Sequence, residues 1–156
     1  MLAYVFWHRR REGVAPAGYE ESLRRFHDLL DVPSASFRLL ELPFATLDGY
    51  EDWYLVEDWQ ALGALNADAV DDLRRDAHDT IAHLAGEGWG GVYALVRGAA
   101  EPPAGTRWLA KQPGRSYEEF LGALPNTSVW QRQMVLGPAA EFCVAGGDSE
   151  GRERLF

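Results

Sequence analysis

The chain has 156 residues, of which 47% are hydrophobic and 25% charged, so it is long enough to bury a core within one globular domain. Its formal net charge is −9, and the acidic residues are interleaved with the basic ones. This balance excludes the clustered Lys and Arg side chains that bind nucleic acids or anionic membrane surfaces. We therefore expect neither nucleic acid nor membrane as a partner.

Cysteine content and the N-terminal segment indicate the compartment. Cys143 is the single cysteine, so the chain forms no internal disulfide bond, as is usual in cytoplasmic proteins. Residues 1–8 are apolar but short, and they lack the basic segment and cleavage site of a signal peptide. No apolar run approaches the roughly 20 residues that span a bilayer. We therefore expect a cytoplasmic protein.

Hydrophobic periodicity divides the first part of the chain into strands and helices. Its strands are rich in β-branched and aromatic residues, and its helices carry apolar residues at intervals of three or four. The predicted elements are a strand at 2–8, a helix at 17–30, strands at 35–42 and 50–57, a helix at 60–84 and a strand at 89–97. Asp58 is a suitable N-cap for the second helix, and Gly86 and Gly88 are expected to end it.

The pattern restarts after a Pro/Gly-rich linker at 99–105. The predicted elements are a strand at 106–111, a helix at 117–124 and strands at 128–136 and 140–145. Ser116 and Glu119 have the spacing of a capping box for this last helix. Residues 146–156 show no period and are expected to form a flexible tail.

Short matches between the two parts predict an internal duplication. The tripeptide Tyr-Glu-Glu occurs near the start of the first helix and again in the last one. Further along, Arg38 matches Arg132 and Glu51 matches Glu141, and the spacing between copies changes only in predicted loops. The second unit then lacks its final helix and strand.

The predicted fold class is α+β, with one domain at 1–145. Residues 1–97 follow the ferredoxin-like order βαββαβ, and residues 106–145 form a truncated βαββ repeat. We expect the two sheets to pack face to face as a barrel-like pseudo-dimer. A second copy of the chain is expected to cover the edge and face left open by the truncation, giving a homodimer.

This arrangement resembles the dimeric α/β-barrel superfamily. The superfamily includes cofactor-independent monooxygenases, lactone isomerases, polyketide cyclases and haem-degrading enzymes. The resemblance covers the whole chain as architecture, and no diagnostic motif of one family accompanies it. It implies a small-molecule site in a cavity between sheets.

Charged groups on predicted strands are the candidate catalytic residues. His8 closes the first strand on the face that carries Tyr4, and it is a candidate general base. Arg38 and Arg132 lie between apolar neighbours and are candidates to stabilise a ligand carboxylate or enolate. Lys111 occupies the place of His8 in the second unit. The alternatives are solvated strand ends for His8 and Lys111, and structural ion pairs for the arginines.

Aromatic residues supply the candidate ligand-binding surface. The densest cluster runs from Tyr50 to Tyr54, where one face of the strand is expected in the core. The other face is suited to a flat apolar ligand. The candidate ligand-binding residues are Tyr4, Trp53, Tyr54 and Lys111. The alternative is that these aromatic side chains serve core packing alone.

Three functions remain open at this point. The first is a cofactor-independent enzyme, or a binder, acting on an aromatic or hydrophobic metabolite in an apolar cavity. The second is a non-enzymatic structural or interaction protein with a packed barrel. The third is a haem-binding or haem-degrading protein with His78 as ligand, although the helical phase of His78 favours an exposed surface position. No histidine pair has metal-ligand spacing with a carboxylate, so we expect no metal and no cofactor.

Overall fold

The computed structural model describes residues 1–133, 138–147 and 149–156. These residues form eight strands and four helices. In chain order they are β1 (Leu2–Arg10), α1 (Pro16–Asp28), β2 (Ser34–Leu39), β3 (Gly49–Val56), α2 (Trp59–Asp68), α3 (Asp72–Leu84), β4 (Ala85–Arg97), β5 (Thr106–Leu109), α4 (Tyr117–Gly122), β6 (Val129–Arg132), β7 (Phe142–Ala145) and β8 (Arg152–Arg154). None of the helices is long and apolar enough to cross a membrane within these ranges.

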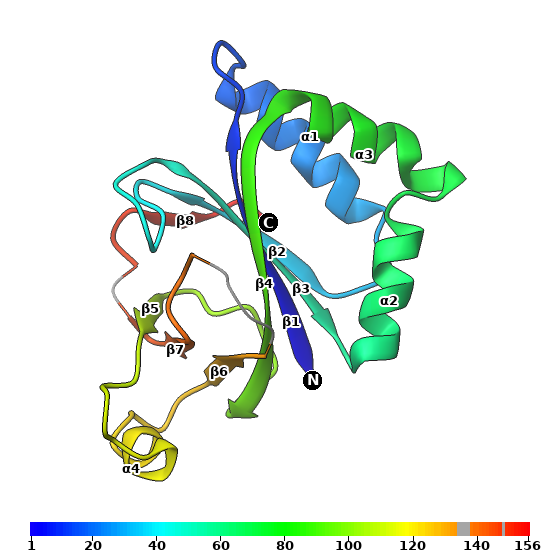
Figure 1. The fold of residues 1–156 in the computed structure, drawn as a ribbon. Coiled ribbons are helices and arrows are strands. Elements are labelled where there is room, and N and C mark those ends of the chain that lie inside the picture. Colours follow the sequence, from blue (N-terminus) through cyan, green and yellow to red (C-terminus); the bar gives the residue numbers. More distant parts are fainter. Residues whose placement is uncertain (134–137, 148) are drawn as a thin grey trace.

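All strands belong to one antiparallel sheet, which curls into a half-barrel (Figure 1). Its strand order is β5-β7-β6-β4-β1-β3-β2-β8. The expectation of two sheets packed face to face is therefore wrong. The cause is the length of β4, whose first part pairs with β1 while Tyr93–Arg97 pairs with β6. One long strand thus joins both halves of the chain into a continuous ladder.

Residues of β1 alternate between the two faces of the sheet, as strand geometry requires. Ala3, Val5 and Trp7 lie on the concave face within its hydrophobic core. Tyr4 and Phe6 lie on the opposite face, which α1, α2 and α3 cover (Figure 1). Both faces are therefore buried near β1, and the face under the helices is the one that forms the candidate site.

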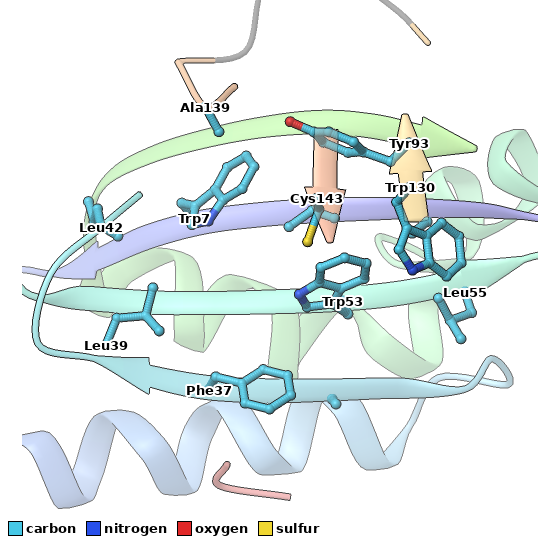
Figure 2. Close-up of a cluster of buried hydrophobic side chains, with 13 residues drawn as sticks. Trp7, Phe37, Leu39, Leu42, Trp53, Leu55, Tyr93, Trp130, Ala139 and Cys143 are labelled. Atoms are coloured by element: carbon cyan, nitrogen blue, oxygen red, sulfur yellow. The ribbon is translucent and has the colours of Figure 1, made fainter. Parts of the chain in front are cut away.

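The concave face is filled by large aromatic side chains (Figure 2). Trp7, Trp53 and Trp130 are fully buried there. Glu51 lies among them, accepting hydrogen bonds from the indole nitrogens of Trp7 at 2.7 Å and Trp53 at 2.5 Å. A buried carboxylate requires hydrogen-bond donors, and here the two indole N–H groups supply them. These hydrogen bonds fix the positions of both rings.

Helix α1 buries the predicted apolar face, but the single helix expected at 60–84 is two helices. Asp58 caps α2 as predicted, accepting from the Ala61 amide at 2.9 Å. The chain then turns at 69–71 before α3 begins. A straight helix of that length would span roughly 37 Å, whereas β1, with 9 residues, spans about 30 Å. Breaking the helix keeps both parts over the sheet, and Leu73 is left exposed.

Glycines expected to end the second helix instead lie within β4. Helix α3 does end at Leu84, and the strand begins at the next residue. A Cβ atom on Gly88 would lie 2.5 Å from Phe6 Cζ, and one on Gly90 would lie 2.7 Å from the Tyr4 hydroxyl. These glycines therefore leave room for aromatic side chains of β1 on the helix-covered face.

The second part of the chain is shorter in regular structure than predicted. Ser116 and Glu119 form the expected capping box at the start of α4. Strands β5, β6 and β7 are each confirmed with narrower limits than the predicted ones. The part of the predicted strand 128–136 that falls at 134–136 lies outside the described residues.

The composition predicted a flexible tail at 146–156, but within the described residues 149–156 the chain forms strand β8. Residues of β8 pair with β2 from Phe37 to Leu39, at the edge of the sheet. Arg152 Nη1 lies 2.7 Å from Glu51 Oε1, and its guanidinium carbon lies 3.6 Å from the centre of the Phe37 ring. The segment is ordered because it covers an open strand edge and neutralises a buried carboxylate.

Candidate functional site

A cleft of about 770 Å³ lies between the sheet and the three helices α1, α2 and α3. Its floor comes from β1, β3 and β4, and its walls come from the helices. The volume falls within the range of small-molecule sites, roughly 300–1,000 Å³. The sequence predicted a cavity between two sheets, but the concave face of the single sheet is filled with indole rings (Figure 2).

The cleft is lined mainly by aromatic and aliphatic side chains. Tyr4 stacks with Phe6 and with Tyr54, each pair having ring centres 6.0 Å apart. The apolar walls come from α1, α2 and α3, with Leu23, Phe26, Leu62, Leu65 and Ile81. Such a surface favours an apolar ligand body over a strongly hydrated one.

Polar groups converge on Asp52 at the floor of the cleft. His8 Nε2 lies 2.9 Å from Asp52 Oδ2, and His27 Nε2 lies 3.3 Å from the same oxygen. The Tyr54 hydroxyl donates to Oδ2 at 3.1 Å. We call His8, Asp52, His27 and Tyr54 the Asp52 cluster. Its members come from β1, β3 and α1, so tertiary packing alone brings them together.

Two further hydroxyl groups orient the imidazole rings. His8 Nδ1 lies 2.6 Å from the Tyr19 hydroxyl, and His27 Nδ1 lies 2.9 Å from Ser34 Oγ. Both rings satisfy these contacts in the neutral form if each donates from Nε2 and accepts at Nδ1. Asp52, His8 and Tyr19 then form a carboxylate, base and hydroxyl in series, which is suited to moving a proton to or from a bound ligand.

Burial and charge set the protonation of this cluster. Burial alone would raise the pKa of Asp52, but positive charge on His8 and His27 and their hydrogen bonds outweigh it, so the pKa lies below its ordinary value. Burial, and then the charge of Asp52, raise the pKa of Tyr54 and of Tyr19. Asp52 is therefore an ionised acceptor near neutral pH, while both tyrosines keep their protons.

Three of the predicted site residues meet in the cleft. Tyr4, His8 and Tyr54 all line it. The expected alternation of His8 with Tyr4 on one strand face is confirmed. His8 is 2% exposed, which overturns the alternative of a solvated strand end.

Two other predicted residues lie away from the cleft. Trp53 points into the concave core (Figure 2). Lys111 Nζ donates to the Arg115 carbonyl at 2.7 Å and lies 5.1 Å from the centre of the Tyr117 ring, beside α4. Trp53 faces the concave core because residues of a strand alternate between its two faces. Lys111 lies outside the sheet because β5 ends at Leu109.

The paired arginines also lie outside the cleft and on opposite faces of the sheet. Arg38 bridges Glu153 of β8 at 2.5 Å and Glu20 of α1 at 3.2 Å, with its side chain 40% exposed. Arg132 is two positions beyond Trp130, on the concave side, and donates to the Ala139 carbonyl at 2.8 Å. The two are therefore not equivalent in position, and structural contacts occupy Arg38.

His78 lies at the cleft, although its position in the sequence favoured the surface. It is among the lining residues, its ring centre is 5.9 Å from that of Phe26, and its Nδ1 lies 3.1 Å from Asp79 Oδ1. Its side chain is 36% exposed, so it belongs to the rim. Within the described ranges, no group of three or more His, Cys, Asp or Glu side chains is arranged to hold a metal ion.

Sequence reasoning missed Asp52, His27 and Tyr19. Asp52 alternates with Tyr50 and Tyr54 on a fully buried strand, and a carboxylate in that position requires buried partners. His27 lies two turns beyond Tyr19 along the apolar side of α1. Each signal points to a buried polar side chain, but neither shows that the two residues meet. No protein-family model, curated protein or solved structure matches this chain.

Proposed function

We propose that the protein binds a small hydrophobic or aromatic molecule in the cleft between the sheet and α1, α2 and α3. The single observation that carries this proposal is a cleft of about 770 Å³ with apolar walls and the buried Asp52 cluster at its floor. Apolar walls with a few convergent polar groups are the usual composition of a small-molecule site. The walls supply affinity, and the cluster orients the polar end of the ligand.

A packed structural protein is less well supported. A solid core leaves no reason for a cleft that reaches buried histidines and a carboxylate. Only the concave face is packed with side chains as expected for a purely structural sheet.

We also propose that residues 1–97 are a ferredoxin-like unit and residues 106–145 a shortened copy of it. Support comes from strand order, because β4-β1-β3-β2 is the order of that fold and all its pairs are antiparallel. The order β5-β7-β6 repeats β1-β3-β2. A helix follows the first strand in each unit.

A thermal-shift assay with a narrowed cleft tests the binding proposal. Ala82 lies on α3, is exposed and lines the cleft, so Ala82→Phe fills the cleft without disturbing the core. Thr80→Phe adds a ring on the same helix outside the cleft and is the matched control. We expect naphthylethanol to raise the melting temperature of the wild type and of Thr80→Phe, but not of Ala82→Phe. Equal stabilisation of all three proteins would contradict binding in the cleft.

A further inference from the structure

One oxygen of the buried Asp52 carboxylate has no partner. Asp52 is 1% exposed, and its Oδ1 has no hydrogen-bond partner among the described residues. His8, His27 and Tyr54 all approach the other oxygen, Oδ2. An unpaired buried acceptor on a charged group is costly, so a donor entering from the cleft would recover that free energy.

The lining of the cleft includes two carboxylates and no Arg or Lys among the residues that the structure describes. The carboxylates are those of Asp52 and of Glu87, and Glu87 lies 3.6 Å from Arg9 Nη1, so Asp52 supplies the charge at the floor. Both imidazoles contact Oδ2, so neither of them satisfies the other carboxylate oxygen, Oδ1. A ligand carboxylate would be repelled there, whereas a cation would be attracted.

Aromatic ring faces beside Asp52 add to this preference. Tyr4 stands at the centre of a stack with Phe6 and Tyr54, and the Phe6 ring centre is 5.3 Å from that of His8. The faces of such rings carry partial negative charge and attract organic ammonium groups. The net charge of −9 attracts cations to the whole molecule.

We infer that the ligand of the cleft is a hydrophobic amine in its ammonium form, whose nitrogen donates to Asp52 Oδ1. Its apolar body lies along Leu62, Leu65 and Ile81, on the walls from α2 and α3. The inference rests on the proposed function and specifies the ligand class.

Calorimetric titration of the wild type with four matched probes tests it. Naphthylethylamine carries the ammonium group, naphthylethanol a neutral donor, N-acetyl-naphthylethylamine a neutral amide and naphthylacetate a carboxylate. We expect the amine to bind about tenfold more tightly than the alcohol or the amide, and naphthylacetate most weakly. Equal or tighter binding of naphthylacetate or of the amide would overturn the inference.

Asp52→Asn provides the second arm of the test. It keeps the shape of the side chain and removes its charge, so the amine should lose about tenfold in affinity while the alcohol changes by less than about threefold. Circular dichroism checks that Asp52→Asn folds. If the variant does not fold, the order of affinities of the four probes for the wild type decides whether the inference holds. An unchanged amine affinity in folded Asp52→Asn contradicts the inference.

The outcomes separate the inference from the proposed function. If all four probes bind with similar affinity and Ala82→Phe abolishes binding, the cleft is a hydrophobic site and the amine preference is wrong. If none of the probes binds, both proposals fail.

Discussion

Asp52 holds together side chains from three separate elements. It contacts His8 of β1, His27 of α1 and Tyr54 of its own strand. Removing the carboxylate leaves these groups buried without their acceptor, so Asp52→Ala should destabilise the fold by about 3 kcal/mol or more. Asp52→Asn retains a hydrogen-bonding group and should cost less. Urea unfolding measures the free energy of unfolding of both variants. An equal loss in the two variants would contradict a role for hydrogen bonding at this position.

The lowered pKa of Asp52 makes stability depend on acid. A carboxyl group with a depressed pKa in the folded state contributes stability that is present above its unfolded pKa of about 3.9 and lost as pH falls further. We therefore expect the free energy of unfolding to decrease as pH falls below about 4. The slope should be smaller in Asp52→Asn, as measured by urea unfolding at a series of pH values. A slope identical to that of the wild type would show that other carboxyl groups cause the pH dependence of stability.

Some individual residues of the cleft could be predicted from the sequence, and others could not. Tyr4 and His8 could be placed on one strand face because alternation is a local property. Asp52 and His27 are distant in sequence, and nothing local shows that they meet. Arg38 forms ion pairs, as the structural alternative for the arginines expected, but its partner Glu153 could not be foreseen because it lies in a segment without any periodic pattern.

Strand β4 has glycine where it lies against large side chains of β1. An alanine Cβ at Gly90 would approach the Tyr4 hydroxyl to 2.7 Å, whereas one at Gly86 has its nearest neighbour at 3.6 Å. The Tyr4 ring is held between Phe6 and Tyr54 and has little room to move. Gly90→Ala should therefore destabilise the fold by about 1–3 kcal/mol through overpacking. Thermal unfolding tests this against Gly86→Ala, and similar losses in both variants would contradict it.

The C-terminal strand contributes a buried cation to the concave core. The Arg152 side chain is 5% exposed and lies 2.7 Å from the carboxylate of Glu51, which is fully buried. Arg152→Ala leaves Glu51 uncompensated and should cost about 3 kcal/mol. Arg154→Ala changes an exposed residue of the same strand and should cost less than about 0.5 kcal/mol. Urea unfolding that gave equal losses would show that β8 acts through its backbone pairing alone.

Most elements could be predicted because their signals are local. Alternation indicated the strands of the first unit, and side-chain caps indicated the starts of α2 and α4. The turn at 69–71 and strand β8 were missed because each depends on distant contacts. The helix breaks to stay over the sheet, and β8 is ordered by its pairing with β2.

The two faces of the sheet differ in character. The concave face is filled by the indole rings of Trp7, Trp53 and Trp130, with Glu51 between them. The opposite face meets three helices that leave a cleft of about 770 Å³. The sequence predicted an α+β fold and an apolar cavity, but not that both halves share one sheet. Strand β4 is long enough to pair with both β1 and β6, and this long-range pairing joins the two halves of the chain in one sheet.

The indole signals of the tryptophans report on both faces in one spectrum. Trp59 lines the cleft and is 48% exposed, whereas Trp7 and Trp53 are buried on the concave face. A nitrogen–proton correlation spectrum recorded during titration with naphthylethylamine and naphthylethanol therefore locates binding directly. Binding in the cleft predicts saturable shifts of the Trp59 indole signal, with those of Trp7 and Trp53 unchanged. Saturable shifts confined to Trp7 and Trp53, or no shifts with either compound, would contradict it.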